Sequence, residues 1–303
     1  MDTKKKLLER YDYAAHMRAG GFMVNGKPAL TQIDPELVAR YVVITVRDPL
    51  LGLQEESADI LSHQLEDRVL AGKSALFTTY SGKYKGTEIS IVSGGSGSSE
   101  AELVLVEFMQ HTKADTFIRL GGAGGISAQA RVGDVVIASG VVRDEGMTRD
   151  YITPAYPAAS NYEVVAALAQ GAEDAGVSYR IGVARSSDSE HVGVGRPSVD
   201  DYFQPRHMEL LDYYDRANIL YTDRESAAVV TLCGLFGRRG GAVCSVGNSL
   251  LTGEEFTPGL GARDANRTVL EGLSRLSQMD HQKACCNKEY WTPSLWREDV
   301  KTK

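Results

Sequence analysis

The chain has 303 residues, 43% of them hydrophobic and 24% charged, so it can bury an ample core without disulfides or metals as staples. Its formal net charge of -7 argues against nucleic acid or an anionic membrane surface as the main partner, since either requires a concentrated basic face. The four cysteines form no CxxC pair, the six histidines lack metal-ligand spacing, and no apolar run has the length of a signal peptide core or a membrane span. We therefore expect a cytoplasmic protein without a metal.

The first part of the chain divides into an extension and the start of a core. Residues 1–40 are predicted to form an N-terminal extension, and the first convincing core strand covers 41–46. That strand ends in Arg47-Asp48-Pro49. Apolar residues at helical spacing, with charges between them, predict an amphipathic helix over 55–69.

Two strand-like runs, 77–84 and 88–92, predict a β-hairpin that leads into a serine- and glycine-rich loop at 93–99. A helix pattern follows this loop directly. A strand, a glycine turn and a helix N-terminus leave backbone N–H groups free, and these favour an anion near Gly94 and Gly95. The alternative is a tight connection with no ligand, because glycine and serine alone are a weak signal.

Residues 114–126 read ADTFIRLGGAGGI, which is typical of a buried parallel strand followed by a tight turn. The turn is predicted at the glycines, beginning with Gly121 and Gly122. Open α/β sheets bind ligands at such a place. Arg119 lies inside the apolar part of this strand. A buried guanidinium must either pair with a core carboxylate or face a ligand, because burying it unpaired is costly.

The second half of the chain continues the alternation of strands and helices. The polar end of a strand at 183–188 should point into the same crevice, and residues 189–202, with His191 and Arg196, are predicted to form either a lid or a disordered excursion. A strand ending near Tyr221 runs through Asp223, Arg224 and Glu225 into a buried helix. We expect these charged side chains to have a functional role rather than simply to lie in solvent. Further elements are predicted at 133–144, 164–176, 241–246 and 265–276.

Four segments in unbroken order between about 40 and 278 resemble the nucleoside phosphorylase family, most closely its uridine phosphorylase branch. They read SGGSGSSEAELVLVEF, FIRLGGAGGISAQARVGDVVIASGVVRDEG, VARSSD and YTDRESAAVVTLCGLFGRRGGAVCSV. The resemblance implies a single α/β domain over 41–280, with a twisted mixed central sheet partly closed into a barrel and flanked by helices. Residues 281–303 are then a C-terminal tail that docks on a neighbour or on the core.

The resemblance also implies a reaction. Phosphate, as co-substrate, attacks the anomeric carbon of a ribonucleoside and releases ribose 1-phosphate and free base, without a metal or organic cofactor. Members of the family form dimers or hexamers built from dimers, so we expect a homo-oligomer whose partners are small molecules, with no nucleic acid and no membrane.

Carried onto this sequence, the family's motifs imply that Arg119 holds phosphate and that Glu225 accepts the ribose hydroxyls. Arg196 falls where an arginine binds the uracil carbonyl, and Asn248 lies near the leaving charge of the base. The remaining predicted substrate-binding residues are Arg47, Gly94, Gly95, Gly121, Gly122, His191, Asp223 and Arg224.

Several positions depart from the family pattern. The phosphate loop reads Arg47-Asp48-Pro49-Leu50-Leu51 and lacks the usual glycine and arginine, while Ala75 and Gly122 replace an arginine and a threonine that contact phosphate. Arg47 and the backbone N–H groups of the glycines are the candidate replacements. On the base and ribose side, Glu190, Val194 and Arg224 replace an aromatic residue, a glutamine and a methionine.

These departures leave two alternatives open beside the phosphorylase. One is a nucleosidase that uses water, with Asp48 or Glu100 as the base. The other is a non-catalytic nucleoside-binding relative or partner subunit, whose site is filled by Arg224 or by the tail.

Overall fold

The computed structural model describes residues 6, 9–10, 21–46 and 57–298. Arg47 and Asp48 therefore lie outside the described residues, as does most of the predicted N-terminal extension before residue 21.

A ten-stranded mixed sheet forms the centre of the molecule, in the order β11-β10-β8-β12-β7-β3-β6-β5-β4, with β9 paired to β8. Its strands are β3 (Tyr41–Thr45), β4 (Glu66–Lys73), β5 (Phe77–Tyr84), β6 (Thr87–Gly94), β7 (Thr116–Gly125), β8 (Val135–Asp144), β9 (Ala158–Ala159), β10 (Tyr179–Ser187), β11 (Ile219–Asp223) and β12 (Arg239–Ser249). The strands β6, β3, β7 and β12 run parallel to one another, as do β8, β10 and β11. An additional pairing between β11 and β7 closes five strands into a ring, which confirms the expected partial barrel.

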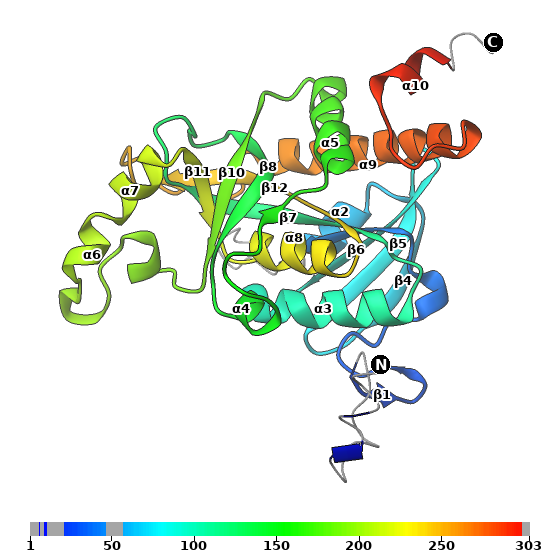
Figure 1. Cartoon of the computed structure of the whole chain (residues 1–303), viewed down its shortest axis with the longest axis horizontal. Helices are drawn as coiled ribbons and strands as arrows, with labels where there is room; N and C mark the ends of the chain where they lie inside the picture. The colour runs from blue at the N-terminus through cyan, green and yellow to red at the C-terminus, as the bar shows by residue number, and fades with distance from the viewer. Residues whose placement is uncertain (1–5, 7–8, 11–20, 47–56, 299–303) are drawn as a thin grey trace.

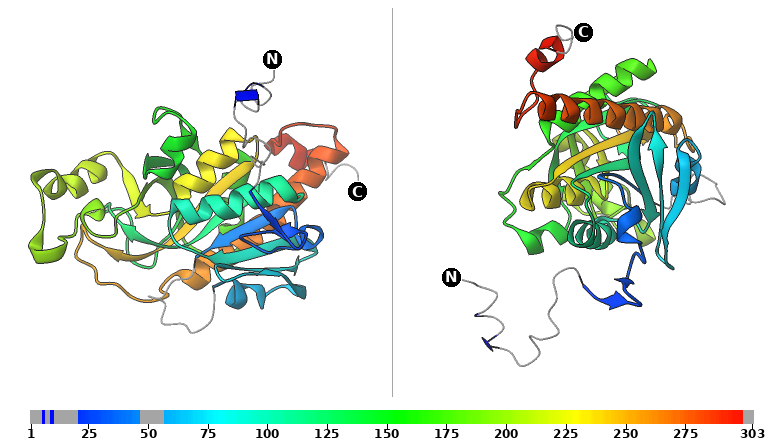
Figure 2. Two further views of the ribbon diagram at one scale, coloured as in Figure 1. Left: turned by 90° about the horizontal axis from the view of Figure 1, so that it is seen from below. Right: turned by 90° about the vertical axis from the view of Figure 1, so that its right-hand side faces the viewer.

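Helices cover both faces of this sheet (Figures 1 and 2). On one side, α5 (Tyr162–Ala175) and α9 (Ala262–Cys285) pack closely together, and a Cβ atom at Gly171 would overlap the backbone of Gly272. On the other side lie α3 (Ser98–His111), α4 (Met147–Tyr151) and α8 (Ser226–Leu235). Each layer encloses its own cluster of buried apolar side chains. The sheet between them is therefore held rigidly from both faces.

The predicted helix over 55–69 is wrong beyond residue 62. The helix α2 covers only Ser57–Ser62, and β4 begins at Glu66 and pairs with β5. Asp67 has a φ of 52°, which a right-handed helix cannot contain. Pairing at the sheet edge has overridden the helical spacing of the apolar residues.

The predicted hairpin is confirmed, with Lys85 and Gly86 as its two-residue turn. Their φ angles of 48° and 78° match the turn type that follows the right-handed twist of paired strands. The predicted tight turn at Gly121 and Gly122 is wrong, because β7 continues through all four glycines to Gly125. Ladder hydrogen bonds to β12, and to β11 at its end, keep this stretch extended.

Both ends of the described chain pack against the domain. In the N-terminal segment, β1 (Met23–Val24) and β2 (Lys27–Pro28) form a small hairpin, and the short helix η2 covers Pro35–Leu37. The buried carboxylate of Glu107 in α3 accepts hydrogen bonds from the backbone N–H groups of Leu30 and Thr31. At the other end, α9 continues past the predicted boundary at 280, and α10 (Pro293–Glu298) lies against it (Figure 1).

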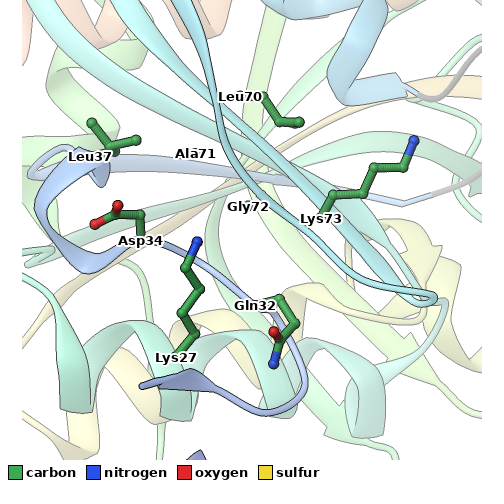
Figure 3. A pocket seen from close by; sticks show the side chains of 8 residues that line it. All are labelled: Lys27, Gln32, Asp34, Leu37, Leu70, Ala71, Gly72 and Lys73. Carbon is green, nitrogen blue, oxygen red and sulfur yellow. The ribbon is translucent and has the colours of Figure 1, made fainter. Parts of the chain in front are cut away.

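A groove of about 310 Å³ separates the N-terminal segment from β4. Figure 3 shows that Lys27 and Asp34 from the segment and Lys73 from β4 line it. It contains none of the predicted site residues. No helix in the part of the chain that the structure describes is long and apolar enough to cross a bilayer.

Candidate active site

The charged residues singled out in the sequence gather where parallel strands of the ring end. Arg119 lies in the middle of β7, Asp223 is the last residue of β11, and Glu225 immediately precedes α8. The glycine-rich loop, defined here as residues 94–97, connects β6 to α3 beside them. Ligand sites of α/β sheets form at this edge, outside the carboxyl ends of the strands.

Arg119 and Glu225 form a buried ion pair at the centre of this cluster. Arg119 donates to Glu225 Oε2 from Nε at 3.0 Å and from Nη2 at 2.7 Å, and its side chain is only 2% exposed. Burial disfavours the charged guanidinium, but Glu225 and Asp223 outweigh it and raise the pKa of Arg119, so it stays cationic. Arg119 Nη1 is buried and has no hydrogen-bond partner among the described residues. The salt bridge therefore satisfies only part of the guanidinium.

Another arginine in the same sheet shows what a fully structural pairing looks like. Arg185 in β10 is also buried; it donates to Asp144 from Nε and Nη2, and its Nη1 contacts Thr222 Oγ1 at 3.4 Å. The ring of Tyr214 covers its guanidinium at 4.6 Å. All three nitrogens of Arg185 have partners, whereas Arg119 keeps one donor unused.

Gly121 leaves room for the unpartnered nitrogen of Arg119. A Cβ atom at this position would overlap Arg119 Nη1. Gly122, the next residue of β7, is exposed. The glycines thus present bare backbone beside a buried cation.

Asp223 supports the start of α8. Its carboxylate accepts hydrogen bonds from the Ser226 backbone N–H at 3.1 Å, from Ser226 Oγ at 2.6 Å and from Ser186 Oγ at 2.7 Å. Burial raises the pKa of Asp223, and the charge of Arg119 offsets this only in part. Its oxygens are committed to the protein, so Asp223 orients the neighbouring groups rather than being free for a substrate.

The glycine-rich loop donates backbone N–H groups, but two of them already hold carboxylates. Gly97 N–H donates to Glu225 Oε1 at 2.6 Å, and Ser96 N–H donates to Glu100 Oε2 at 2.9 Å. Gly95 and Gly97 have φ angles of 60° and 96°, which glycine adopts readily. The N–H groups that donate are those of Ser96 and Gly97 rather than of the predicted Gly94 and Gly95, and the oxygens that accept belong to the chain itself.

Arg224 lies between the glycine-rich loop and the predicted lid. Its Nη1 donates to Ser96 Oγ at 3.3 Å, and its Nε is buried without a hydrogen-bond partner among the described residues. On its other side, Arg224 Nε lies 3.8 Å from Glu190 Oε1. Ser96 and Glu190 are thus site contacts that the sequence did not assign to binding.

Asn248 lies on β12 beside the glycines of β7. It pairs in register with Gly124, and its Oδ1 would be 3.4 Å from a Cβ atom placed there. Asn248 is therefore on the same ring of strands as Arg119.

The predicted lid is ordered around two short helical turns, η4 (Val192–Val194) and η5 (Val199–Asp201), followed by α6 (Pro205–Met208) and α7 (Leu210–Arg216). The backbone N–H of Arg196 donates to the carbonyl of His191 at 2.9 Å. Neither side chain has a hydrogen bond or ion pair to the Arg119 cluster among the described residues. The lid residue that does reach the cluster is Glu190, through Arg224.

No group of three His, Cys, Asp or Glu side chains is arranged to hold a metal ion within residues 21–46 and 57–298 or at residues 6, 9 and 10. The four cysteines are free thiols. The groups that the structure brings together at the cluster are two arginines, buried carboxylates and backbone N–H groups.

Comparison with known proteins agrees with this geometry. The model of the phosphorylase superfamily matches residues 42–271. The chain is 34% identical over 266 residues to a uridine phosphorylase of Thermococcus kodakarensis, covering 86% of this chain and 91% of that protein. It is 30% identical over 197 residues to a guanosine phosphorylase of Halorubrum lacusprofundi, covering 65% of this chain and 76% of that protein.

A solved structure leads to the same family. The crystal structure of uridine phosphorylase from Vibrio fischeri is similar with a TM-score of 0.69 at 25% identity, covering 84% of this chain and all of that one. The sequence match, the closed ring of strands and the position of the charged cluster agree with one another. This chain belongs to the phosphorylase superfamily, in its uridine phosphorylase branch.

Proposed function

We propose that this chain is a uridine phosphorylase-like pentosyltransferase, which cleaves the N-glycosidic bond of a ribonucleoside with phosphate to give ribose 1-phosphate and free base. The observation that carries the proposal is the buried Arg119, which is ion-paired to Glu225 and keeps one unpartnered nitrogen beside Gly121. Relatives named as uridine phosphorylases, one of them matching over most of both chains, support the same reaction.

Arg119 is the proposed phosphate ligand. Its free Nη1 donates to a phosphate oxygen, and the exposed backbone at Gly122 lets that oxygen approach closely. Arg224 adds a second positive charge at the glycine-rich loop. Holding phosphate below the anomeric carbon converts its attack into a reaction within one complex, which removes much of the entropic cost.

Glu225 is the proposed ribose ligand. A carboxylate has about four acceptor sites; Arg119 takes two of them and Gly97 N–H a third, so one remains for a ribose hydroxyl. The sugar becomes cationic as the base departs. A fixed carboxylate beside the ring stabilises that charge in the transition state more than in the ground state.

The base is proposed to lie between Asn248 and the lid. Asn248 offers an amide to the departing base, and Arg196 and His191 on the lid are proposed to contact its carbonyl oxygens. These two side chains require movement of the lid toward the Arg119 cluster. Lid closure of this kind excludes water from the reacting atoms.

At the level of the cell, we propose a cytoplasmic enzyme of pyrimidine nucleoside salvage that requires no metal or organic cofactor. The functional unit is proposed to be a homodimer or a hexamer built from dimers.

The decisive experiment is release of free base from uridine, thymidine, inosine and adenosine, each incubated with and without phosphate. The proposal predicts release from uridine only with phosphate, together with equimolar ribose 1-phosphate. Phosphate-dependent release from a purine nucleoside instead would keep the reaction and change the substrate. No release from any nucleoside would favour a non-catalytic relative.

Hydrolysis is the second candidate, and the glycine-rich loop is the observation that favours it. Two of its N–H groups already hold carboxylates, which leaves fewer donors for phosphate, and in this alternative Glu100 would be the acceptor of a proton from water. Equal release of base with and without phosphate would establish this reaction. The described part of the tail, up to residue 298, does not fill the site: Trp291 donates hydrogen bonds to Glu163 and Gln282 on the α5 and α9 side of the sheet.

A further inference from the structure

The glycine-rich loop binds two carboxylates that come from different parts of the fold. Glu225 reaches Gly97 N–H from the start of α8, and Glu100 folds back from the first turn of α3 onto Ser96 N–H. The Glu100 side chain lies directly over Gly95, where a Cβ atom would overlap its carboxylate. The loop is thus an anion site that is already occupied in the protein.

The two carboxylates differ in how their charge is balanced. Glu225 is neutralised by Arg119, which lies 2.7 Å away and is equally buried. Glu100 has no lysine, arginine or histidine within ion-pair distance in the part of the chain that the structure describes. Its carboxylate is instead held by the backbone N–H of Ser96 at the positive end of α3.

Helix capping alone does not account for the position of Glu100. In a capping box, a glutamate at the third helical position accepts from the backbone N–H of the N-cap residue. Here the N-cap is Gly97, and its N–H is taken by Glu225. Glu100 therefore reaches one residue further, to Ser96, and lies over the loop instead of closing the helix end.

We propose that Glu100 is a resident anion of the glycine-rich loop, which competes with phosphate and so sets the phosphate affinity of the enzyme. The proposal rests on the proposed phosphorolysis. Phosphate must approach Arg119 and Arg224 next to the Glu100 carboxylate, and it either displaces that carboxylate or binds beside a like charge. Glu100 is thus a specificity-determining residue for the co-substrate, distinct from the residues that hold it.

The test is Glu100→Gln, which removes the charge but keeps an oxygen that can accept from Ser96 N–H. The KM for phosphate, measured at saturating uridine, should fall by about tenfold while kcat stays within about twofold, because a nearby charge changes binding more than chemistry. Glu88→Gln is the matched control, since it removes one negative charge from an exposed site on β6. This control should leave both constants unchanged.

Calorimetric titration with inorganic phosphate measures the same effect without turnover. The wild type should bind phosphate about tenfold more weakly than Glu100→Gln, and Glu100→Ala, which empties the loop, should bind at least as tightly as Glu100→Gln. Unchanged phosphate affinity in both variants would mean that Glu100 is only a helix cap. Loss of base release in a folded Glu100→Gln would mean that the carboxylate is required for the chemistry, and either result overturns the proposal.

The two proposals fail in distinguishable ways. If the wild type releases no base with phosphate, phosphorolysis is wrong, while the calorimetric comparison of wild type and Glu100→Gln still decides whether Glu100 opposes anion binding. If the wild type requires phosphate but both variants bind it as the wild type does, phosphorolysis stands and the competition is wrong.

Discussion

Arg119 and Arg185 are equally buried, but they differ in how many of their guanidinium nitrogens have a hydrogen-bond partner. The structural arginine, Arg185, has a partner for every nitrogen, and an aromatic ring covers its plane. Arg119 is buried as well, but its Nη1 has no hydrogen-bond partner among the described residues. A buried donor without a partner costs about 1–3 kcal/mol, so a ligand that supplies an acceptor gains that free energy on binding.

Glu225→Gln removes the charge that is proposed to face the cationic sugar, and it leaves Arg119 without its main counter-ion. We expect kcat to fall by about 10²- to 10³-fold, the range found when a group that stabilises transition-state charge is removed. Steady-state kinetics with uridine and phosphate measure this change. Unaltered turnover in Glu225→Gln would show that the Glu225 carboxylate is not needed for the reaction.

Gly121→Ala places a methyl group where Arg119 Nη1 now lies. Because β7 is fixed by ladders on both sides, the guanidinium must move, so we expect the KM for phosphate to rise by at least about tenfold with a stability loss of about 1–3 kcal/mol. Gly124→Ala is the matched variant on the same strand, because its Cβ would meet only ordinary contacts. A phosphate KM that is equal in the two variants would contradict the prediction.

At the scale of elements, local pattern predicted those with strong signals of their own. The hairpin turn at Lys85-Gly86 and the end of helix α5 at Gly176 both need positive φ angles, 78° at Gly86 and 65° at Gly176, which glycine adopts readily. Pairing between distant segments decided the others. The strand β4 forms because β5 is beside it, and β7 extends through its glycines because β12 and β11 bind it, which no local pattern reports.

Like the secondary-structure elements, the residues of the candidate site could be predicted from the sequence only in part. Arg119 was conspicuous as a charge in an apolar strand, and family motifs indicated Glu225. The contact of Glu100 with Ser96 could have been suspected only from an acidic residue in the first turn of a helix after a glycine loop. How the lid sits relative to the cluster depends on packing over 189–216, a segment with little apolar periodicity.

A charged cluster fastens α9 to the sheet, and Asp280 is its centre. Asp280 accepts hydrogen bonds from Arg239 at 2.8 and 2.7 Å and from the Tyr41 hydroxyl at 2.8 Å. Burial raises the pKa of Asp280, but the hydrogen bonds and charge of Arg239 outweigh it and hold the pKa at about 2, below the usual 3.8. A depressed pKa stabilises the folded state above about pH 4, and that stability is lost as the pH falls from about 4 to 2.

Asp280→Asn should therefore lower the free energy of unfolding at pH 7 by at least roughly 2 kcal/mol, and should flatten the loss of stability between about pH 4 and 2. Urea unfolding at a series of pH values measures both effects. Asp150→Asn, an exposed carboxylate in α4, is the control. If the free energy of unfolding falls equally steeply between about pH 4 and 2 in wild type and Asp280→Asn, the low pKa of Asp280 is contradicted.

At the scale of the whole molecule, the described part of the C-terminal tail lies away from the lid. In Figure 1, α6 and α7 extend on the side of β11, whereas α10 lies at the opposite end of α9. Trp291 joins the tail to the domain, donating from its backbone N–H to Glu163 and from Nε1 to Gln282. These contacts tie the tail to the helical layer.

Trp291→Ala should accordingly affect stability and leave catalysis unchanged. We expect a fall in unfolding temperature of a few degrees, because a large side chain and a hydrogen bond are lost from a half-buried site, with kcat/KM for uridine within about twofold of wild type. Differential scanning fluorimetry and steady-state kinetics on the same preparation test both parts. A large loss of kcat/KM without a change in unfolding temperature would place the tail in the catalytic unit.

The pairing of β11 with β7 has a consequence for how this enzyme can change. It joins the strand that carries Asp223 and leads to Glu225 directly to the strand that carries Arg119, so the reacting centre is part of a closed hydrogen-bonded ring. Residues 189–202, which are proposed to meet the base, lie outside that ring. The lid contacts of the base can therefore vary while Asn248 and the Arg119 cluster are kept, and a combinatorial library confined to this segment should yield new base preferences without loss of phosphorolysis.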